Sequence, residues 1–298
     1  MRHSDVTAGR DDLGMFPSRL VQLARRAAGI AALAVLVITS AATTANAGAA
    51  DVPDRPIRVA TFNIHHAQGG DDKLDLQRVA DVIRTGEADV VGLQEVDRHW
   101  SERSEFADQA SWLAERLHMH VVYGANLDLD PLTAGAPRRQ YGTAILSRYP
   151  ILDWDNTLLP RYDGHEQRGL LRALVQVRGV RVQVFNTHLQ HNNAGERLEQ
   201  VRAIQPLVAA REEPVVLTGD LNARPDAPEI RALSETLTDA WPGAGTGDGY
   251  TYPATGSNAR IDYVFTSADV RVQSAAVVQS DASDHLPLFV DLLVGRRG

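Results

Sequence analysis

Two oxygen-bearing side chains stand two positions apart near the middle of the chain. Asp220 and Asn222 lie in Thr-Gly-Asp-Leu-Asn at 218–222, directly after an apolar run at 215–217. On an extended backbone, side chains at positions i and i+2 point to the same side, so a carboxylate and a carboxamide oxygen would face one spot. Oxygen donors of this kind suit Mg²⁺, Mn²⁺ or Ca²⁺ rather than zinc or copper. A polar turn is the alternative, because Gly-Asp and Asn are common turn formers.

Further polar side chains stand where other predicted strands begin or end. They are Asn63, Glu95, His188, Asp262, Asp284 and His285. Glu95, together with Asp220 and Asn222, could hold a hard divalent cation through oxygen atoms. His188 and His285 can donate and accept protons near neutral pH, because a free imidazole has a pKa of ~6.5. Asp262 could orient one of these histidines, as the third member of a catalytic triad orients the base.

These residues require a scaffold rich in strands. Alternating or continuous apolar runs predict strands at 57–64, 90–94, 119–123, 141–147, 151–158, 170–177, 180–187, 215–217, 261–265, 270–278 and 286–293. Apolar residues at helical spacing predict helices at 75–85, 108–117 and 196–204, and Pro228 suits the first turn of a short helix. Pro206 is expected to kink or restart the third helix, and 126–140 is expected to be a loop. The pattern predicts an α+β fold with two sheets packed face to face and helices outside.

The N-terminus has the pattern of an export signal. An uncharged 16-residue stretch at 27–42 follows Arg25 and Arg26 and precedes Ala45-Asn46-Ala47. This is the order of regions in a signal peptide, and the stretch is short for a membrane span, which needs ~20 apolar residues. We therefore expect residues 1–47 to be a signal peptide, 48–56 a lead-in and 57–298 a single domain of a secreted protein. A single-span membrane anchor is the alternative.

Charge and cysteine content narrow the possible functions. The chain has 298 residues, a single lysine, Lys73, and no cysteine. Thiol catalysis, disulfides and cysteine-type zinc sites are therefore excluded. Without residues 1–47 the chain keeps 25 basic and 35 acidic side chains, a formal net charge of −10. An acidic protein is not a strong general binder of polyanions, so any contact with nucleic acid needs a local basic patch.

Seven short segments, taken in order, resemble one known family. They are Thr-Phe-Asn-Ile at 61–64, Leu-Gln-Glu-Val-Asp at 93–97, Tyr-Gly-Thr-Ala-Ile-Leu-Ser at 141–147, Asn-Thr-His-Leu at 186–189, Thr-Gly-Asp-Leu-Asn at 218–222, Arg-Ile-Asp-Tyr-Val at 260–264 and Ser-Asp-His-Leu-Pro at 283–287. In these segments the chain is similar to the metal-dependent endonuclease/exonuclease/phosphatase superfamily, which includes DNase I, apurinic endonucleases, neutral sphingomyelinases and inositol-polyphosphate 5-phosphatases. The similarity runs from Arg58 to about Leu292 and is greatest to small secreted bacterial-type members.

The resemblance implies a DNase I-like, four-layer αββα sandwich with the site at one edge of the two sheets. It implies a Mg²⁺ site, with Mn²⁺ or Ca²⁺ as alternatives, formed by Glu95, Asn63 and Asp284. The implied catalytic residues are His188, Asp220, Asn222, Asp262 and His285. Arg168 and His65 would contact the substrate phosphate, although Arg168 is a loose match and a loop role is the alternative for His65.

The reaction implied is hydrolysis of a phosphate ester by in-line attack of an activated water. Either His285, oriented by Asp262, or Asp220 would take the proton of that water. We expect a monomer with no obligate protein partner. Nucleic acid, phospholipid and inositol phosphate remain open as substrates, with a nuclease-type phosphodiesterase slightly favoured. The alternatives are a phospholipase C-like, sphingomyelinase-like or inositol-phosphate phosphatase activity and, more remotely, an inactive binding module. A zinc hydrolase is disfavoured because the chain has no H-E-x-x-H motif.

Overall fold

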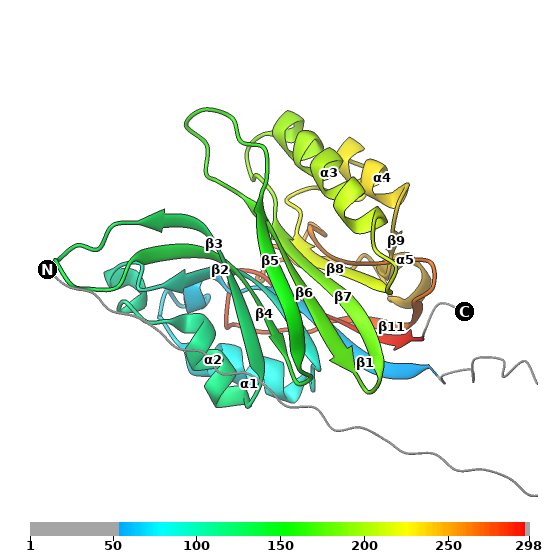
Figure 1. Ribbon diagram of the computed structural model, residues 1–298, viewed down its shortest axis with the longest axis horizontal. Coiled ribbons are helices and arrows are strands. Elements are labelled where there is room, and N and C mark those ends of the chain that lie inside the picture. Colours follow the sequence, from blue (N-terminus) through cyan, green and yellow to red (C-terminus); the bar gives the residue numbers. More distant parts are fainter. Residues whose placement is uncertain (1–53, 296–298) are drawn as a thin grey trace, which may run out of the picture. The chain divides into compact units, whose positions relative to one another are not determined.

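The structure, a computed structural model, describes residues 54–295. The predicted signal peptide at 1–47 and most of the lead-in at 48–56 lie outside the described residues. Within 54–295, two six-stranded sheets pack face to face, and helices cover their outer faces (Figure 1). The predicted four-layer αββα sandwich is therefore confirmed. The first strand begins at Arg55, two residues before the predicted domain boundary.

Each sheet is mixed and has its only parallel pair of strands at its centre. The first sheet runs in the order β11 (Arg271–Val277), β12 (Leu288–Val294), β1 (Arg55–Asn63), β2 (Val90–Arg98), β4 (Arg139–Ser147) and β3 (His120–Leu129). The second runs in the order β5 (Ile151–Leu158), β6 (Gly169–Val177), β7 (Val180–His188), β8 (Val215–Asp220), β10 (Asp262–Thr266) and β9 (Thr238–Asp239). β1 pairs in parallel with β2, and β7 with β8. The carboxyl ends of each central pair therefore meet at one edge of their sheet.

Three of the four longer helices begin after a residue whose side chain caps the helix. α1 (Leu76–Thr85) and α2 (Gln109–Leu117) cover the first sheet, and α3 (Ala194–Ala209) and α4 (Pro228–Ser234) cover the second. Asp75, Asp108 and Asn193 accept backbone hydrogen bonds as N-caps of α1, α2 and α3. Three short helices complete the fold: η1 (His65–Ala67), η2 (Glu102–Ser104) and α5 (Trp241–Ala244). Among residues 54–295 no helix is both long and apolar enough to cross a membrane.

Polar side chains join the two sheets at the centre of an otherwise valine-rich interface. Asn186 on β7 donates to the carbonyls of Leu93 and Ala144 in the opposite sheet, at 2.8 and 2.9 Å. Its Oδ1 accepts from Gln94 at 2.7 Å and from Thr218 at 3.1 Å. All of these side chains are buried, so the network fixes how the sheets register.

One predicted strand was too short. The strand at 90–94 continues to Arg98, and Glu95 lies inside it at a β-bulge between Leu93 and Val96. Glu95 has a φ of +56°, and bulges of this kind redirect a side chain. Its place in the site therefore comes from the bulge and not from a strand end.

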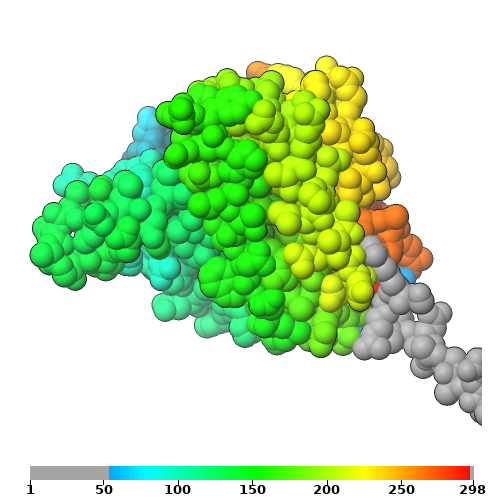
Figure 2. Space-filling model, turned by 45° about the horizontal axis from the view of Figure 1, so that its top comes forward, coloured from blue at the N-terminus to red at the C-terminus, as the bar shows by residue number. Residues whose placement is uncertain are grey.

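The segment predicted to be a loop, 126–140, is a loop at 130–138, and strands extend into both of its ends. β3 runs to Leu129 and β4 starts at Arg139, and this end of the sheet projects from the rest of the domain (Figures 1 and 2). Arg138 pairs with Asp128 at 2.6 Å and Asp130 at 2.7 Å. Ion pairs therefore join the chain segments where β3 and β4 extend. Charged residues give no apolar period, so the sequence pattern did not indicate these extensions.

Pro206 does not restart its helix, which was one of the two predicted outcomes. α3 runs through it to Ala209, and the N–H of Ala210 donates to the Pro206 carbonyl at 3.1 Å. Ile204 and Val208, on either side of the proline, are both buried against the second sheet. Burial of this stripe outweighs the loss of one helical hydrogen bond.

Gly92 marks the closest approach of the sheets and gives a test of the interface. A Cβ at this position would lie 2.0 Å from Thr218 Oγ1 and 2.8 Å from Asn186 Oδ1. We expect Gly92→Ala to lower the free energy of unfolding by ~1–3 kcal/mol, because the overpacked network has no room to shift. Urea denaturation measures the change. Gly70→Ala is the control, since a Cβ there meets nothing within 4 Å. A Gly92→Ala variant as stable as the control would contradict this account of the interface.

Candidate active site

The side chain of Asn63 connects the two sheets at the ends of their central strands. Asn63 ends β1, Asp220 ends β8 in the other sheet, and both are buried. The Nδ2 group of Asn63 donates to Glu95 Oε1 and to Asp220 Oδ2, each at 3.0 Å. Its Oδ1 accepts from the His65 N–H at 3.1 Å, so the amide oxygen faces the backbone. Asn63 therefore holds two carboxylates in place in the protein without bound ions.

Asp220 is almost completely enclosed. Its Oδ2 lies 3.4 Å from His188 Nε2 and 3.7 Å from His285 Nε2, and its side chain is about 2 % exposed. Burial raises the pKa of Asp220, and the charge of Asp262 raises it further, to about 7. Hydrogen bonds from Asn63 and the His285 charge oppose this shift. A carboxylate with such a pKa can exchange a proton near neutral pH.

His285 and Asp262 form a buried pair beside Asp220. His285 Nδ1 lies 2.9 Å from Asp262 Oδ2, and the Tyr252 ring packs against the imidazole with ring centroids 4.7 Å apart. Asp262 lies directly opposite Asp220 in the β8–β10 register. Burial alone lowers the pKa of His285, but the charges of Asp262 and Asp220 outweigh it and raise the pKa to about 10. His285 is therefore a cation at neutral pH in the protein without bound ions.

Asn222 supports Asp220 differently from the sequence-based prediction. β8 ends at Asp220, and Asn222 has a φ of +50°, so the extended geometry assumed for the pair does not apply. The backbone N–H of Asn222 donates to Asp220 Oδ1 at 2.9 Å. Its side-chain amide donates to the Leu189 carbonyl at 3.1 Å. Asn222 thus holds Asp220 through its backbone and fixes the loop with its side chain.

His188 and Arg168 form the opposite wall of the site. Burial keeps the pKa of His188 well below 6.5, and the charge of Arg168 lowers it further, so His188 is neutral. Arg168 is 3 % exposed and pairs with Glu166 at 2.7 Å. Its Nη2 lies 3.5 Å from His191 Nδ1. His191 was not among the predicted site residues, although its place three residues after His188, near the end of the same strand, was a usable signal.

The side chains of Glu95, His65 and His66 meet on the first-sheet side of Asn63. One ligand atom of each lies within 4.8 Å of the other two. His65 Nδ1 is also 3.6 Å from Asp284 Oδ1, which brings Asp284 to the same place. Among residues 54–295, Glu95 makes no ion pair, so its carboxylate is available to a cation. The donor set of one or two carboxylates and two imidazoles fits a divalent metal ion.

Asp220, Asp262 and His285 also cluster within 4.8 Å, but their contacts favour another role. The hydrogen bond between His285 and Asp262 engages both groups, and Asp220 accepts from Asn63 and Asn222. These three side chains are therefore suited to acid–base chemistry and form the acid–base group, whereas the cluster at Glu95 is the one that could hold a metal ion. The predicted site residues thus lie in two adjacent groups, one around Glu95 and one around Asp220. Asn63 joins the two groups, and Arg168 lies beside His188.

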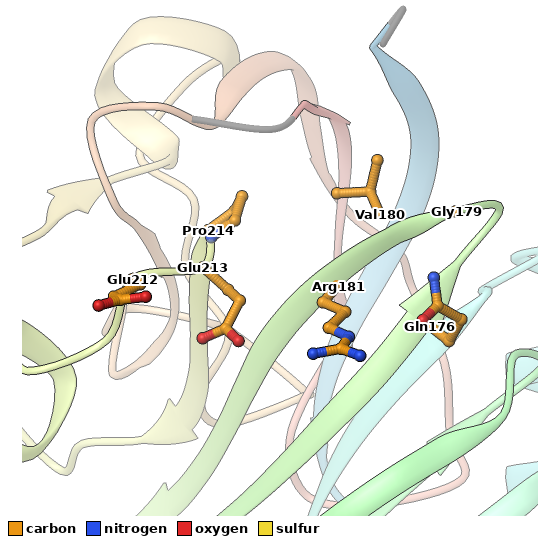
Figure 3. A pocket seen from close by; sticks show the side chains of 7 residues that line it. All are labelled: Gln176, Gly179, Val180, Arg181, Glu212, Glu213 and Pro214. Carbon is orange, nitrogen blue, oxygen red and sulfur yellow. The ribbon is translucent and has the colours of Figure 1, made fainter. Parts of the chain in front are cut away.

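A separate hollow lies at the other end of the second sheet (Figure 3). It is lined by Gln176, Gly179, Val180, Arg181, Glu212, Glu213 and Pro214. These residues surround the β6–β7 turn and the start of β8, whereas His188 and Asp220 lie where β7 and β8 end. The hollow is therefore remote from the acid–base group.

Known proteins resemble this chain over most of its length. A family model described as the Endonuclease/Exonuclease/phosphatase family matches residues 60–285. An endonuclease/exonuclease/phosphatase from Beutenbergia cavernae DSM 12333 is 32 % identical, with a TM-score of 0.70 over 81 % of this chain and 72 % of that chain. Uncharacterized protein YbhP of Escherichia coli (strain K12) is 26 % identical over 253 residues, 79 % of this chain and 95 % of YbhP.

A more distant structure shares the fold. The Bacteroides thetaiotaomicron VPI-5482 mannosyl-6-phosphatase Bt3783 is 20 % identical, with a TM-score of 0.64 over 79 % of this chain and 99 % of that chain. The family match spans both halves of the site, from β1 to His285. By this match and by its αββα fold, the chain belongs to the endonuclease/exonuclease/phosphatase family.

Proposed function

We propose that the protein is a metal-dependent phosphoric ester hydrolase in which Asp220 is the general base. The observation that carries this proposal is the position of Asp220, buried where both sheets end and within 4 Å of His188 and His285. Its pKa of about 7 suits a base that works near neutral pH. His285, with a pKa of about 10, is already protonated and is a poor base.

The roles of the remaining side chains follow from their protonation states. Asp220 takes a proton from the water that attacks phosphorus in line. Neutral His188 donates through Nε2–H to a phosphoryl oxygen, and Arg168 supplies positive charge beside it. Cationic His285, held by Asp262, compensates the negative charge that develops in the transition state. A divalent ion held at Glu95 would polarise the phosphate ester and neutralise its charge.

The distribution of charge favours a substrate with one phosphate group over a nucleic acid. Arg168 is paired with Glu166, Arg103 with Asp97, and Arg138 with two aspartates. A polyanion needs a stripe of unneutralised Lys and Arg along its path. We therefore propose a small or lipid phosphate ester, in place of the nuclease-type substrate that the sequence slightly favoured.

An apolar pocket gives specific support to a substrate with an apolar group. It is lined by His99, Phe106, Leu132, Thr133, Ala136, Pro137 and Arg139, beyond the end of β2. Tyr141 follows Arg139 of this pocket by two residues on β4, and the charge of Glu95 acts on it. Its pKa is raised well above 10 by burial and next by the Glu95 charge, and Arg103 lies over its ring at 5.5 Å.

We also propose that the mature chain is exported and that it is a monomer.

Substitution of Asp220 tests the assignment of the base. We expect Asp220→Asn to lower the turnover of bis-p-nitrophenyl phosphate by ~10²–10⁴-fold in Mg²⁺ or Mn²⁺, because the variant cannot accept the proton. Glu95→Ala should lose turnover as well, and EDTA should abolish it in the wild type. The exposed Asp226→Asn is the matched control. Full activity of Asp220→Asn would reject Asp220 as the base.

The His285–Asp262 pair predicts how stability depends on pH. The pKa of His285 is higher in the folded chain than in the unfolded chain (~6.5), so its stabilisation is fully present below the unfolded value and is lost as pH rises through about 10. In Asp262→Asn the pKa of His285 falls, so this loss should shrink by on the order of 1 kcal/mol or more. Urea unfolding of EDTA-treated protein between pH 7 and pH 10 measures it, with Asp226→Asn as control. Identical pH slopes in wild type and Asp262→Asn would refute the pairing.

The apolar pocket is tested by comparing two substrates. We expect Leu132→Asp to lower kcat/KM for sphingomyelin in mixed micelles by ~10-fold, because a buried apolar contact is worth ~1–2 kcal/mol. The same variant should hydrolyse bis-p-nitrophenyl phosphate normally. Leu152→Asp, at an exposed leucine on β5, is the control. Equal effects on both substrates, or faster cleavage of plasmid DNA than of either, would exclude the apolar pocket from substrate binding.

A further inference from the structure

Two consecutive histidines follow β1 in an unusual backbone conformation. His65, His66 and Ala67 have φ values of +45°, +45° and +62°, in the left-handed region that non-glycine residues rarely adopt. This path places the two imidazole rings edge to face, with centroids 4.6 Å apart. Strain of this kind persists only where the surroundings hold it, and it is concentrated at functional sites.

The hydrogen bonds around His66 leave one ring nitrogen as a bare acceptor. Gln68 Nε2 donates to Asp72 Oδ1 at 3.1 Å, which turns the Gln68 amide oxygen toward His66 Nε2, 3.2 Å away. Nε2 therefore carries the hydrogen, and Nδ1 carries a lone pair. A second group that fixes the tautomer in this way is the usual support of a metal-binding histidine.

His66 Nδ1 has no partner for that lone pair. The residue is 5 % exposed, and among residues 54–295 this nitrogen is buried without a hydrogen-bond partner. An unsatisfied buried acceptor costs ~1–3 kcal/mol. The bare Nδ1 belongs to a histidine that lies beside His65 and Glu95, and it therefore points to a ligand.

We infer that His65, His66 and Glu95 form a binding site for a first-row transition-metal ion. One donor atom of each lies within 4.8 Å of the others, and Asp284 stands beside His65. Imidazole nitrogen favours ions such as Co²⁺ and Zn²⁺, whereas Mg²⁺ and Ca²⁺ prefer all-oxygen sites. This chain therefore selects a softer ion than the Mg²⁺ that the resemblance implied. His65 becomes a metal ligand instead of a phosphate contact.

This inference deepens the proposed function, because the same ion would serve hydrolysis at Glu95. Binding can nevertheless be measured without any substrate. Hydrolysis that fails while Co²⁺ and Zn²⁺ still bind through the histidines would overturn the proposed function and leave the metal site standing. Metal-dependent hydrolysis by variants that lack both histidines would support the proposed function and overturn the metal site.

The experiment titrates the EDTA-treated full chain with Co²⁺, Zn²⁺ and Mg²⁺ separately, by calorimetry and, for Co²⁺, by visible absorption. We expect one ion per chain, tighter binding of Co²⁺ and Zn²⁺ than of Mg²⁺, and a Co²⁺ spectrum showing nitrogen ligands. His66→Ala and His65→Ala should weaken Zn²⁺ binding at least ~10–100-fold, and Gln68→Ala should weaken it to a similar or smaller extent. Mg²⁺ binding should change little in all three.

The control is His120→Ala, at an exposed histidine on β3. Circular dichroism confirms that each variant is folded. His65→Ala and Gln68→Ala keep the test decisive if the buried His66→Ala fails to fold, because both positions are partly exposed. Unchanged Co²⁺ spectra and Zn²⁺ affinities in these variants, or tighter binding of Mg²⁺ than of Zn²⁺ by the wild type, would overturn the inference.

Discussion

The hydrogen bonds of one amide hold the two halves of the site together. Asn63 donates to a carboxylate from each sheet, Glu95 and Asp220, and this requires the ends of β1 and β8 to lie within hydrogen-bond reach. The sheets reach that distance because Gly92 lets them approach and Asn186 fixes their register. The site therefore depends on inter-sheet packing as much as on its own side chains.

Differences in burial and in neighbouring charge give different pKa values to side chains that would titrate alike in water. His188 and His285 are both enclosed, yet the first lies near Arg168 and stays neutral, while the second faces two carboxylates and is cationic. Asp220 is placed between them, and its burial makes it a weak acid. A neutral donor, a cation and a base with a pKa near neutrality thus come from two residue types by environment alone.

Much of this architecture was predictable from the sequence, because strands with buried faces carry a strong apolar pattern. The features that were not predictable depend on contacts between distant segments. The bulge at Glu95 depends on pairing with β4, and the end of β8 before Asn222 depends on pairing with β10. The place of His191 beside Arg168 depends on the paths of two loops, and no local pattern encodes such a path.

The most direct test of the central claim is hydrolysis of bis-p-nitrophenyl phosphate in ¹⁸O-labelled water with a divalent metal ion. A buried base that activates water for attack on phosphorus predicts one ¹⁸O atom in the phosphate product and none in p-nitrophenol, with no product in EDTA. Label in the p-nitrophenol, or label in the phosphate at an equal rate without metal, would contradict the account.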